Sequence, residues 1–224
     1  MQTILKADHI VKHFYQPEPF EVLKGVSFEA KKGEFLSVVG KSGCGKSTLL
    51  YILSTMDTEY QGTLQMNNEA LTGLSQNALS RFRNEHMGFV FQFHYLLPEF
   101  TALKNVMLPA LKLGKYSDKE VEARAYEKLH SMGMGDYALK PASRLSGGQQ
   151  QRVAIARALV NDPAIIMGDE PTGNLDQANT RIIFDIFMKL AKENGQTIIA
   201  VTHDKDFAAA SDRIIEMSDG RIVN

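Results

Sequence analysis

The sequence predicts an α/β fold built on a mainly parallel β-sheet with helices on both faces. Short apolar runs, typical of buried strands, alternate along the chain with longer segments of helical periodicity. A glycine-rich loop joins the first of these strands directly to a helix. Because strands and helices alternate, neighbouring strands are expected to be parallel and covered on both sides. The strands are predicted at 35–39, 164–167 and 197–201, and the helices at 47–54, 149–160 and 182–193.

A smaller antiparallel layer is expected to open the protein. Residues 5–14 and 23–30 carry apolar side chains at alternate positions, and a proline-containing loop separates them. They are interpreted as two strands at a sheet edge. The middle of the chain is expected to be mostly helical. The remaining predicted elements are helices over 75–85 and 117–132 and a final hairpin around Asp219 and Gly220.

The composition of the chain limits the classes of partner and location that are expected. The chain has 224 residues, of which 44% are hydrophobic, enough for one large domain with a substantial core. Its 25 basic and 26 acidic residues give no basic surplus, so no nucleic-acid partner is expected. A single cysteine cannot form an internal disulfide, and the first residues lack the pattern of a secretory signal, so a cytosolic location is expected. No apolar run approaches the length of about 18 to 20 residues that spans a bilayer, so a membrane role requires a partner.

The glycine-rich loop has the pattern of a phosphate-binding loop. Residues 40–47 read G-K-S-G-C-G-K-S, directly after an apolar strand and directly before a helix. Backbone N–H groups of such a loop surround the phosphates, while Lys46 reaches the terminal phosphates and Ser47 supplies a Mg²⁺ ligand. A merely structural turn is the alternative, and the strand–loop–helix context disfavours it. The nucleotide-binding residues predicted here are Gly40, Lys41, Ser42, Gly43, Cys44, Gly45, Lys46, Ser47 and Thr48.

Two adjacent carboxylates end the strand predicted at 164–167. Asp169 and Glu170 follow it closely, at the strand tip where a metal ion and a water molecule would need them. Asp169 is predicted to hold Mg²⁺, and Glu170 to orient or deprotonate the attacking water. A solvated strand end is the simpler interpretation of the pair alone. The phosphate loop favours the catalytic one.

A third motif decides among the classes of nucleotide hydrolase. Residues 145–149 read L-S-G-G-Q before a helix, and Ser146 is a plausible cap for it. The exposed N–H groups at this helix start make a second anion-binding site. The motif is the signature of the ATP-binding cassette (ABC) family, which the chain resembles along nearly its whole length. The corresponding predicted nucleotide contacts are Ser146, Gly147, Gly148 and Gln149.

The resemblance to ABC proteins implies roles for further residues. Gln92 resembles the glutamine that senses Mg²⁺ and takes part in catalysis, and Asp176 ends the N-L-D of the loop that contacts nucleotide across the dimer. His203 resembles the catalytic switch histidine, alongside Lys46 and Glu170. Phe14 is predicted to stack on adenine, with Tyr15 as the alternative.

The resemblance also implies the architecture and the assembly. It implies a P-loop NTPase (RecA-like) core with an antiparallel β subdomain, formed by residues 1–91 and 150–224, and an inserted α-helical subdomain, residues 92–149, that carries the signature. Two copies would form a head-to-tail homodimer. Each ATP would lie between the phosphate loop of one copy and the signature of the other, with Mg²⁺ as cofactor.

One segment bears on which ABC system the chain serves. Residues 92–106 closely resemble the same stretch of lipoprotein-releasing ATPases. These ATPases belong to a subgroup that also includes macrolide-export and cell-division ATPases. Apolar side chains between Phe93 and Phe100 are expected to form a groove for separate integral membrane subunits of the LolC/LolE type, although core packing of these residues is the alternative. The expected function is ATP-driven lipoprotein release at the cytoplasmic face of the inner membrane. A macrolide-type exporter and a cell-division complex remain as alternatives.

Overall fold

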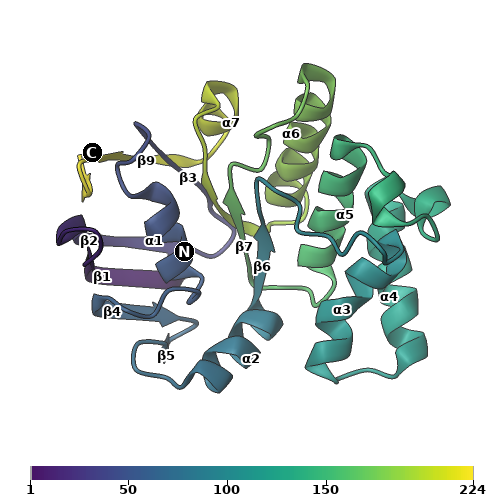
Figure 1. Cartoon of the computed structure of the whole chain (residues 1–224), viewed down its shortest axis with the longest axis horizontal. Coiled ribbons are helices and arrows are strands. Elements are labelled where there is room, and N and C mark those ends of the chain that lie inside the picture. Colours follow the sequence, from purple (N-terminus) through teal and green to yellow (C-terminus); the bar gives the residue numbers. More distant parts are fainter. Residues whose placement is uncertain (1, 224) are drawn as a thin grey trace.

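The computed structural model describes residues 2–223 and contains two β-sheets with helices between and beside them (Figure 1). The first sheet is antiparallel, with strand order β2-β1-β4-β5. Since β1 pairs with both β2 and β4, it lies inside this sheet, and the prediction of two edge strands is wrong for β1. The strands are β1 (Thr3–Phe14), β2 (Phe20–Lys31), β4 (Gln61–Met66) and β5 (Glu69–Ala70).

The second sheet is the predicted parallel one. Its order is β10-β9-β3-β8-β7-β6, and every pairing from β9 to β6 is parallel. Strand β3 lies between β9 and β8, although these strands are far from it in the sequence. The carboxyl ends of these parallel strands therefore lie side by side. The strands are β3 (Phe35–Gly40), β6 (Met87–Val90), β7 (Ile165–Asp169), β8 (Thr197–Val201), β9 (Arg213–Ser218) and β10 (Arg221–Ile222).

Helix α1 (Lys46–Leu53) packs between the two sheets. The parallel strands are buried on both faces, and alternate residues point to opposite sides. Ile165 and Met167 join the core around α1, whereas Ile166 between them joins the core on the other face. This packing fixes the phosphate loop, because the loop lies between β3 and α1.

The other face of the parallel sheet is covered by helices. In Figure 1, α6 and α7 stand above the sheet and α3, α4 and α5 form a group on its right. One continuous core joins these helices to the sheet. The helices are α2 (Gln76–His86), α3 (Ala102–Leu113), α4 (Asp118–Ser131), α5 (Gly147–Leu159), α6 (Gln177–Lys192) and α7 (Lys205–Ala209).

The α/β fold class predicted from the sequence is confirmed. The sequence interpretation missed β4, β5, β6, α3 and α7. Helix α3 has buried residues beside exposed ones and contains Pro109, which is usually a helix breaker. Helix α6 begins at Gln177, five residues before the predicted start at 182, because Asp176 caps its N-terminus.

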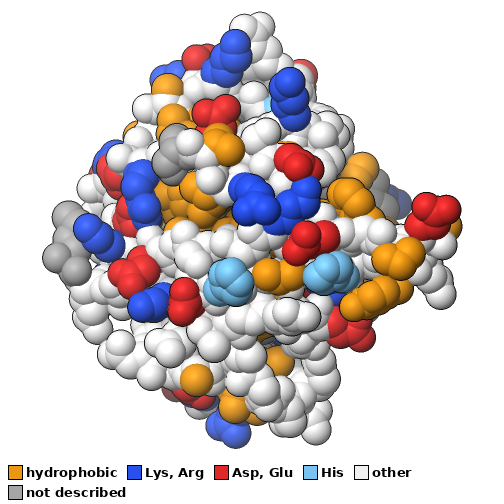
Figure 2. Space-filling view, turned by 90° about the vertical axis from the view of Figure 1, so that its left-hand side faces the viewer, with side chains coloured by type: hydrophobic (Ala, Val, Ile, Leu, Met, Phe, Trp, Pro, Cys, Tyr) orange, Lys and Arg blue, Asp and Glu red, His pale blue; other side chains and the backbone are white. Residues whose placement is uncertain are grey.

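Among residues 2–223, no helix combines the length and the apolarity that a bilayer crossing requires. Figure 2 shows the side of the molecule that carries the antiparallel sheet. Lys and Arg side chains are interspersed there with Asp and Glu, and no broad area of one charge dominates (Figure 2).

The helical region is tied to the loop before β7 by a cluster of charges. Lys128 Nζ donates a hydrogen bond to Asp162 Oδ1 at 2.6 Å, and Arg124 binds the other carboxylate oxygen. Burial opposes ionisation of Asp162, but the hydrogen bonds from Lys128 and Arg124 prevail and hold the pKa of the carboxyl below its usual value. Because the pKa is lower in the folded state, the ionised Asp162 stabilises the fold above its unfolded-state pKa.

We therefore expect Asp162→Asn to lower the free energy of unfolding by about 0.5–1 kcal/mol at pH 7, since the pair is partly exposed. The difference from wild type should stay constant down to about pH 5 and shrink as the pH falls further, as the wild-type carboxyl becomes protonated. Urea denaturation across this pH range measures it, with Glu122→Gln on the exposed face of α4 as the control. A pH-independent difference would show that the charge of Asp162 contributes nothing.

Candidate functional site

The phosphate loop occupies the turn from β3 to α1. Its glycines are required by the backbone: Gly45 precedes the helix with φ of 100°, and a Cβ on Gly40 would lie 2.3 Å from the carbonyl oxygen of Met217. Lys46 Nζ turns back over the loop and donates to the carbonyl oxygens of Gly40 and Lys41 at 2.9 and 3.0 Å. The ammonium group is thus held over the concave side of the loop, where it can contact an anion.

The loop opens into a pocket of about 510 Å³. Two predicted loop residues lie outside its lining: the side chain of Lys41 is exposed, and Cys44 is buried in the core. Phe20 and Val22 of β2 line the pocket and were missed from the sequence, because only the fold brings β2 beside the loop. The predicted residues that line it are Phe14, Gly40, Ser42, Gly43, Gly45, Lys46, Ser47, Thr48, Glu170 and His203.

Asp169 lies at the end of β7 and is only 9% exposed. Ser47 Oγ donates to its Oδ1 at 3.0 Å, and the hydroxyl of Tyr51 donates to its Oδ2 at 3.2 Å. Burial raises the pKa of the Asp169 carboxyl, while the two hydrogen bonds act against that rise. A serine hydroxyl and a carboxylate are hard oxygen donors, and Mg²⁺ is usually held by one or two such protein groups together with phosphates. This pair therefore fits Mg²⁺.

Glu170 adopts a left-handed backbone conformation with φ of 47°, which is unusual for a residue with a side chain. Its backbone N–H donates to the carbonyl oxygen of Val201 at 2.9 Å. Its Oε2 accepts the backbone N–H of His203 at 3.1 Å and lies 2.9 Å from His203 Nδ1. The loop after β8 thus holds the Glu170 carboxylate at the pocket, where it can accept a proton from a water molecule.

Gln92, predicted as a metal ligand, lies in the segment after β6. Its side chain lies against Gly173, where a Cβ would come within 3.0 Å of Gln92 Nε2. In the part of the chain that the structure describes, no hydrogen bond joins Gln92 to Ser47 or Asp169. The structure therefore places the Gln92 side chain beside Gly173, in the turn after Glu170.

The signature lies outside this pocket, at the N-terminus of α5. Ser146 and Gln149 form a capping box, in which Gln149 N donates to Ser146 Oγ at 3.4 Å. Ser146 and Gly147 are exposed, whereas Gly148 packs so closely on α6 that a Cβ would lie 1.9 Å from Asn179 Oδ1. Asp176 caps α6 and accepts hydrogen bonds from the backbone N–H of Asn179 at 2.8 Å and from its side-chain Nδ2 at 2.7 Å. These two hydrogen bonds lower the pKa of the Asp176 carboxyl. The pocket of the same copy is not lined by Asp176 or by residues 146–149.

Of the two aromatic residues predicted as candidates for adenine stacking, only Phe14 lines the pocket. Phe14 lines the pocket and is 44% exposed, with Lys12 Nζ 5.2 Å from its ring centroid. Lys12 is fixed in turn by an ion pair with Asp57 at 2.8 Å. Tyr15 is 73% exposed, stacks on His13 and does not line the pocket. Phe14 is thus the residue positioned to stack on a base.

We expect Phe14→Ala to weaken ATP binding about tenfold, because stacking on a base contributes about 1–3 kcal/mol. Tyr15→Ala should leave the affinity within about twofold of wild type, since that ring points elsewhere. Titration with a fluorescent ATP analogue measures both dissociation constants. A larger loss in Tyr15→Ala than in Phe14→Ala would reverse the assignment.

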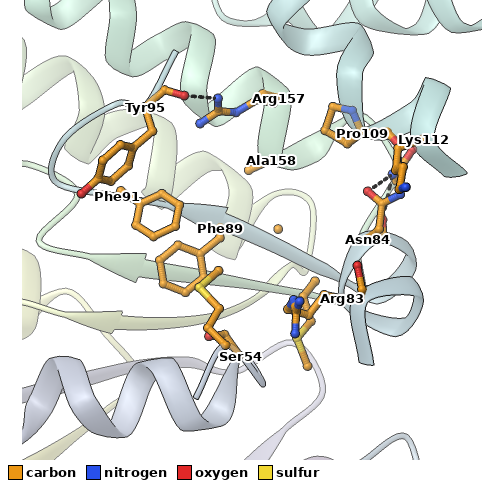
Figure 3. A pocket seen from close by; sticks show the side chains of 15 residues that line it. Ser54, Arg83, Asn84, Phe89, Phe91, Tyr95, Pro109, Lys112, Arg157 and Ala158 are labelled. Carbon is orange, nitrogen blue, oxygen red and sulfur yellow. Dashed lines mark hydrogen bonds between the residues drawn. The ribbon is translucent and has the colours of Figure 1, made fainter. Parts of the chain in front are cut away.

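The segment after Gln92 is exposed. Phe93, Tyr95, Leu97 and Phe100 are 61, 65, 43 and 37% exposed, so core packing does not account for them. Tyr95 borders a groove of about 430 Å³ between β6, α2, α3 and α5. Figure 3 shows the aromatic rings on one side of the groove and Arg83, Pro109 and Lys112 on the other.

Arg157 of α5 fixes the segment above the groove. Its two terminal nitrogens donate to the carbonyl oxygens of Tyr95 and His94 at 2.7 and 2.8 Å. Figure 3 shows the bond to Tyr95. The groove lining includes three cationic side chains and no Asp or Glu among the described residues. Two of these cations, Arg83 and Lys112, lie opposite the aromatic rings, and the third, Arg157, lies beside Tyr95 (Figure 3). The three cationic residues are Arg83, Lys112 and Arg157.

Comparison with known proteins gives the family of the chain. The model of the family described as ABC transporter matches residues 23–173. The lipoprotein-releasing system ATP-binding protein LolD of Aquifex aeolicus is 48% identical over 223 residues, covering 100% of this chain and 97% of that protein. LolD of Cytophaga hutchinsonii is 47% identical over 223 residues, covering 100% of both.

Solved structures agree with the fold. The ATP-binding cassette MJ0796, in a dimeric post-hydrolysis state bound to ADP and Pi, superposes with a TM-score of 0.91 at 39% identity, covering 99% of this chain and 97% of that one. Another dimeric structure of MJ0796 gives a TM-score of 0.90 at 40% identity, with the same coverage. The match spans the phosphate loop, the strand that ends in Asp169 and the signature helix, and it shows that this chain belongs to the ABC transporter family as an ATP-binding cassette.

Proposed function

We propose that the protein is the ATP-hydrolysing subunit of an ABC transporter that energises the release of lipoproteins from the inner membrane toward the outer membrane. The observation that carries the hydrolytic part is the Glu170 carboxylate, held by His203 at a pocket formed by a phosphate loop. The similarity to LolD proteins along the whole chain supports the lipoprotein-releasing part.

In this proposal, the residues of the pocket divide the work of phosphoryl transfer to water. The loop N–H groups and Lys46 bind the phosphates, and Phe14 stacks on adenine. Ser47, Asp169 and Gln92 would hold Mg²⁺. When bound, Mg²⁺ neutralises charge on the phosphates. Glu170 accepts the proton of the attacking water, and His203 keeps the carboxylate aimed at it.

The composite site requires two copies. The residues at the start of α5 do not line the copy's own pocket, and Ser146 and Gly147 are exposed, so the anion-binding end of this helix is free to meet the nucleotide of another copy. We propose a head-to-tail homodimer in which Ser146, Gly147, Gly148 and Gln149 of each copy complete the partner's site, with Asp176 nearby. In each copy, residues 1–91 and 150–224 form the catalytic core and 92–149 the helical subdomain. The boundary at 149 lies inside α5, which would therefore transmit movement between the two.

The groove beside Tyr95 is proposed as the dock for the membrane subunits. Its aromatic side fits an apolar anchor, and its Arg83 and Lys112 fit carboxylates on the same partner segment. We propose separate integral membrane subunits of the LolC/LolE type, which would hold the protein at the cytoplasmic face of the inner membrane.

Co-purification tests the choice of system. The Glu170→Gln variant, tagged and trapped with ATP, is purified from gently solubilised membranes of the native host, and the retained integral proteins are identified by mass spectrometry. We expect two related membrane subunits with large periplasmic domains. Tyr95→Ser added to the tagged protein should reduce their recovery about tenfold or more, since Tyr95 lines the groove and a central aromatic contact contributes about 2 kcal/mol or more.

Tyr126→Ser is the matched control, because Tyr126 is a similarly exposed aromatic on α4, away from the groove. It should leave recovery unchanged. Recovery of a division-type partner, a fused exporter or only ribosomal proteins would contradict lipoprotein release and leave the ATPase proposal standing.

A further inference from the structure

Helix α1 offers two hydroxyl groups to one carboxylate. Ser47 and Tyr51 are four residues apart, so their side chains lie one above the other on the same face of the helix. Ser47 Oγ donates to Asp169 Oδ1 at 3.0 Å, and the Tyr51 hydroxyl donates to Oδ2 at 3.2 Å. Both oxygens of the carboxylate are therefore held by a single rigid element.

The two donors differ in what else they do. Ser47 lines the nucleotide pocket and is itself a proposed Mg²⁺ ligand, whereas Tyr51 does not line that pocket. Tyr51 therefore has no proposed contact with nucleotide or metal, and its hydroxyl acts on the site only through Asp169. Partners of this kind orient a ligand and fix which of its oxygens faces the metal.

The ring of Tyr51 lies beside the aromatic rings of the groove wall, and with Phe91 and Tyr95 it lines a smaller neighbouring cavity. Its centroid lies 6.3 Å from that of Phe89, and Phe89 lies 4.2 Å from Phe91. Phe91 in turn meets Tyr95 edge-on at 5.0 Å. Figure 3 shows Phe89, Phe91 and Tyr95 as one wall of the groove. Four aromatic rings in contact thus extend from the groove wall to the oxygen of Asp169.

We propose that Tyr51 is a positioning residue for the metal-binding carboxylate of Asp169, and that the ring of Phe89, at the inner end of the groove wall, holds Tyr51 in place. The inference rests on the proposed Mg²⁺ site and deepens it, because it links that site to the surface where the membrane subunits dock. Tyr51 lies outside the motifs of the nucleotide site. A partner that shifts the groove wall would change the orientation of Asp169 through this contact.

The test measures metal affinity, not turnover. Mn²⁺ binding to the purified protein saturated with ADP is followed by electron paramagnetic resonance. Tyr51→Phe keeps the ring and removes only the hydroxyl, and we expect it to weaken Mn²⁺ binding about tenfold, the lower end of losses for partners of metal ligands. ADP affinity in EDTA should stay unchanged. Tyr126→Phe, an exposed tyrosine of α4, is the control and should change neither affinity.

Phe89→Leu tests the link to the groove, because it leaves the Tyr51 hydroxyl intact and removes the ring beside it. We expect it to weaken Mn²⁺ binding by about threefold, and the double variant to be no weaker than Tyr51→Phe alone, since the two residues act in series. Additive losses, or no loss in Phe89→Leu, would overturn the link. Unchanged Mn²⁺ affinity in Tyr51→Phe would overturn the positioning role alone. Absence of Mn²⁺ binding in the wild-type ADP complex would remove the proposed metal site itself.

Discussion

Replacing Glu170 with glutamine is expected to reduce ATP hydrolysis about 10²- to 10⁴-fold, the range that a general base contributes. Glutamine preserves the shape of the side chain and can still accept the hydrogen bond from the His203 N–H, but it cannot take a proton from water. ATP binding should be retained, because Lys46 and the loop N–H groups are untouched. With hydrolysis blocked, ATP and Mg²⁺ should therefore convert the variant to stable dimers.

Phosphate release measures the turnover, and light scattering after size exclusion measures the dimer. Glu122→Gln, an exposed change on α4, is the matched control and should behave as wild type in both assays. Turnover above about a tenth of wild type in Glu170→Gln would place the general base elsewhere. Failure to dimerise with ATP would contradict the composite site.

Lys46→Ala is expected to weaken ATP binding about 10- to 100-fold, since each hydrogen bond to a charged group contributes about 1.5–3 kcal/mol. The lysine ammonium is already held over the concave side of the loop by the carbonyl oxygens of Gly40 and Lys41, so it needs little reorganisation to meet a phosphate. The variant should lose ATP-dependent dimerisation in proportion. Titration with a fluorescent ATP analogue measures the dissociation constant.

Lys41→Ala provides the control within the same loop. Its side chain is exposed and does not line the pocket, so the affinity should fall by less than about threefold, as expected for a solvent-screened charge. Similar losses in both variants would mean that only the net charge of the loop matters. Thermal melting without nucleotide checks that Lys46→Ala leaves the fold intact.

The parts of the site that the sequence could predict are those whose geometry is local. Residues 40–47 lie in one turn between a strand and a helix, so the spacing alone places Lys46 and Ser47. Asp169 and Glu170 end a strand that is buried throughout, and parallel strands bring their ends to one edge of the sheet. Ser146, predicted as a helix cap, caps α5, which begins at Gly147, two residues before the predicted start at 149.

The parts that escaped prediction depend on contacts between distant segments. Phe20 and Val22 reach the pocket because β2 packs beside the phosphate loop, and no spacing in the sequence announces that contact. Tyr51 was predicted only as part of a helix, and its hydrogen bond to Asp169 depends on how α1 packs on β7. The contact of Gln92 with Gly173 likewise joins segments far apart in the sequence.

The most direct test of the central claim is lipoprotein release with Glu170→Gln as the only copy of the protein in its native host. Membrane fractionation then measures the share of lipoproteins retained in the inner membrane, with Glu122→Gln as the control. We predict retention of lipoproteins in the inner membrane with Glu170→Gln and wild-type delivery with Glu122→Gln. Normal delivery to the outer membrane by cells that carry only Glu170→Gln would contradict the account.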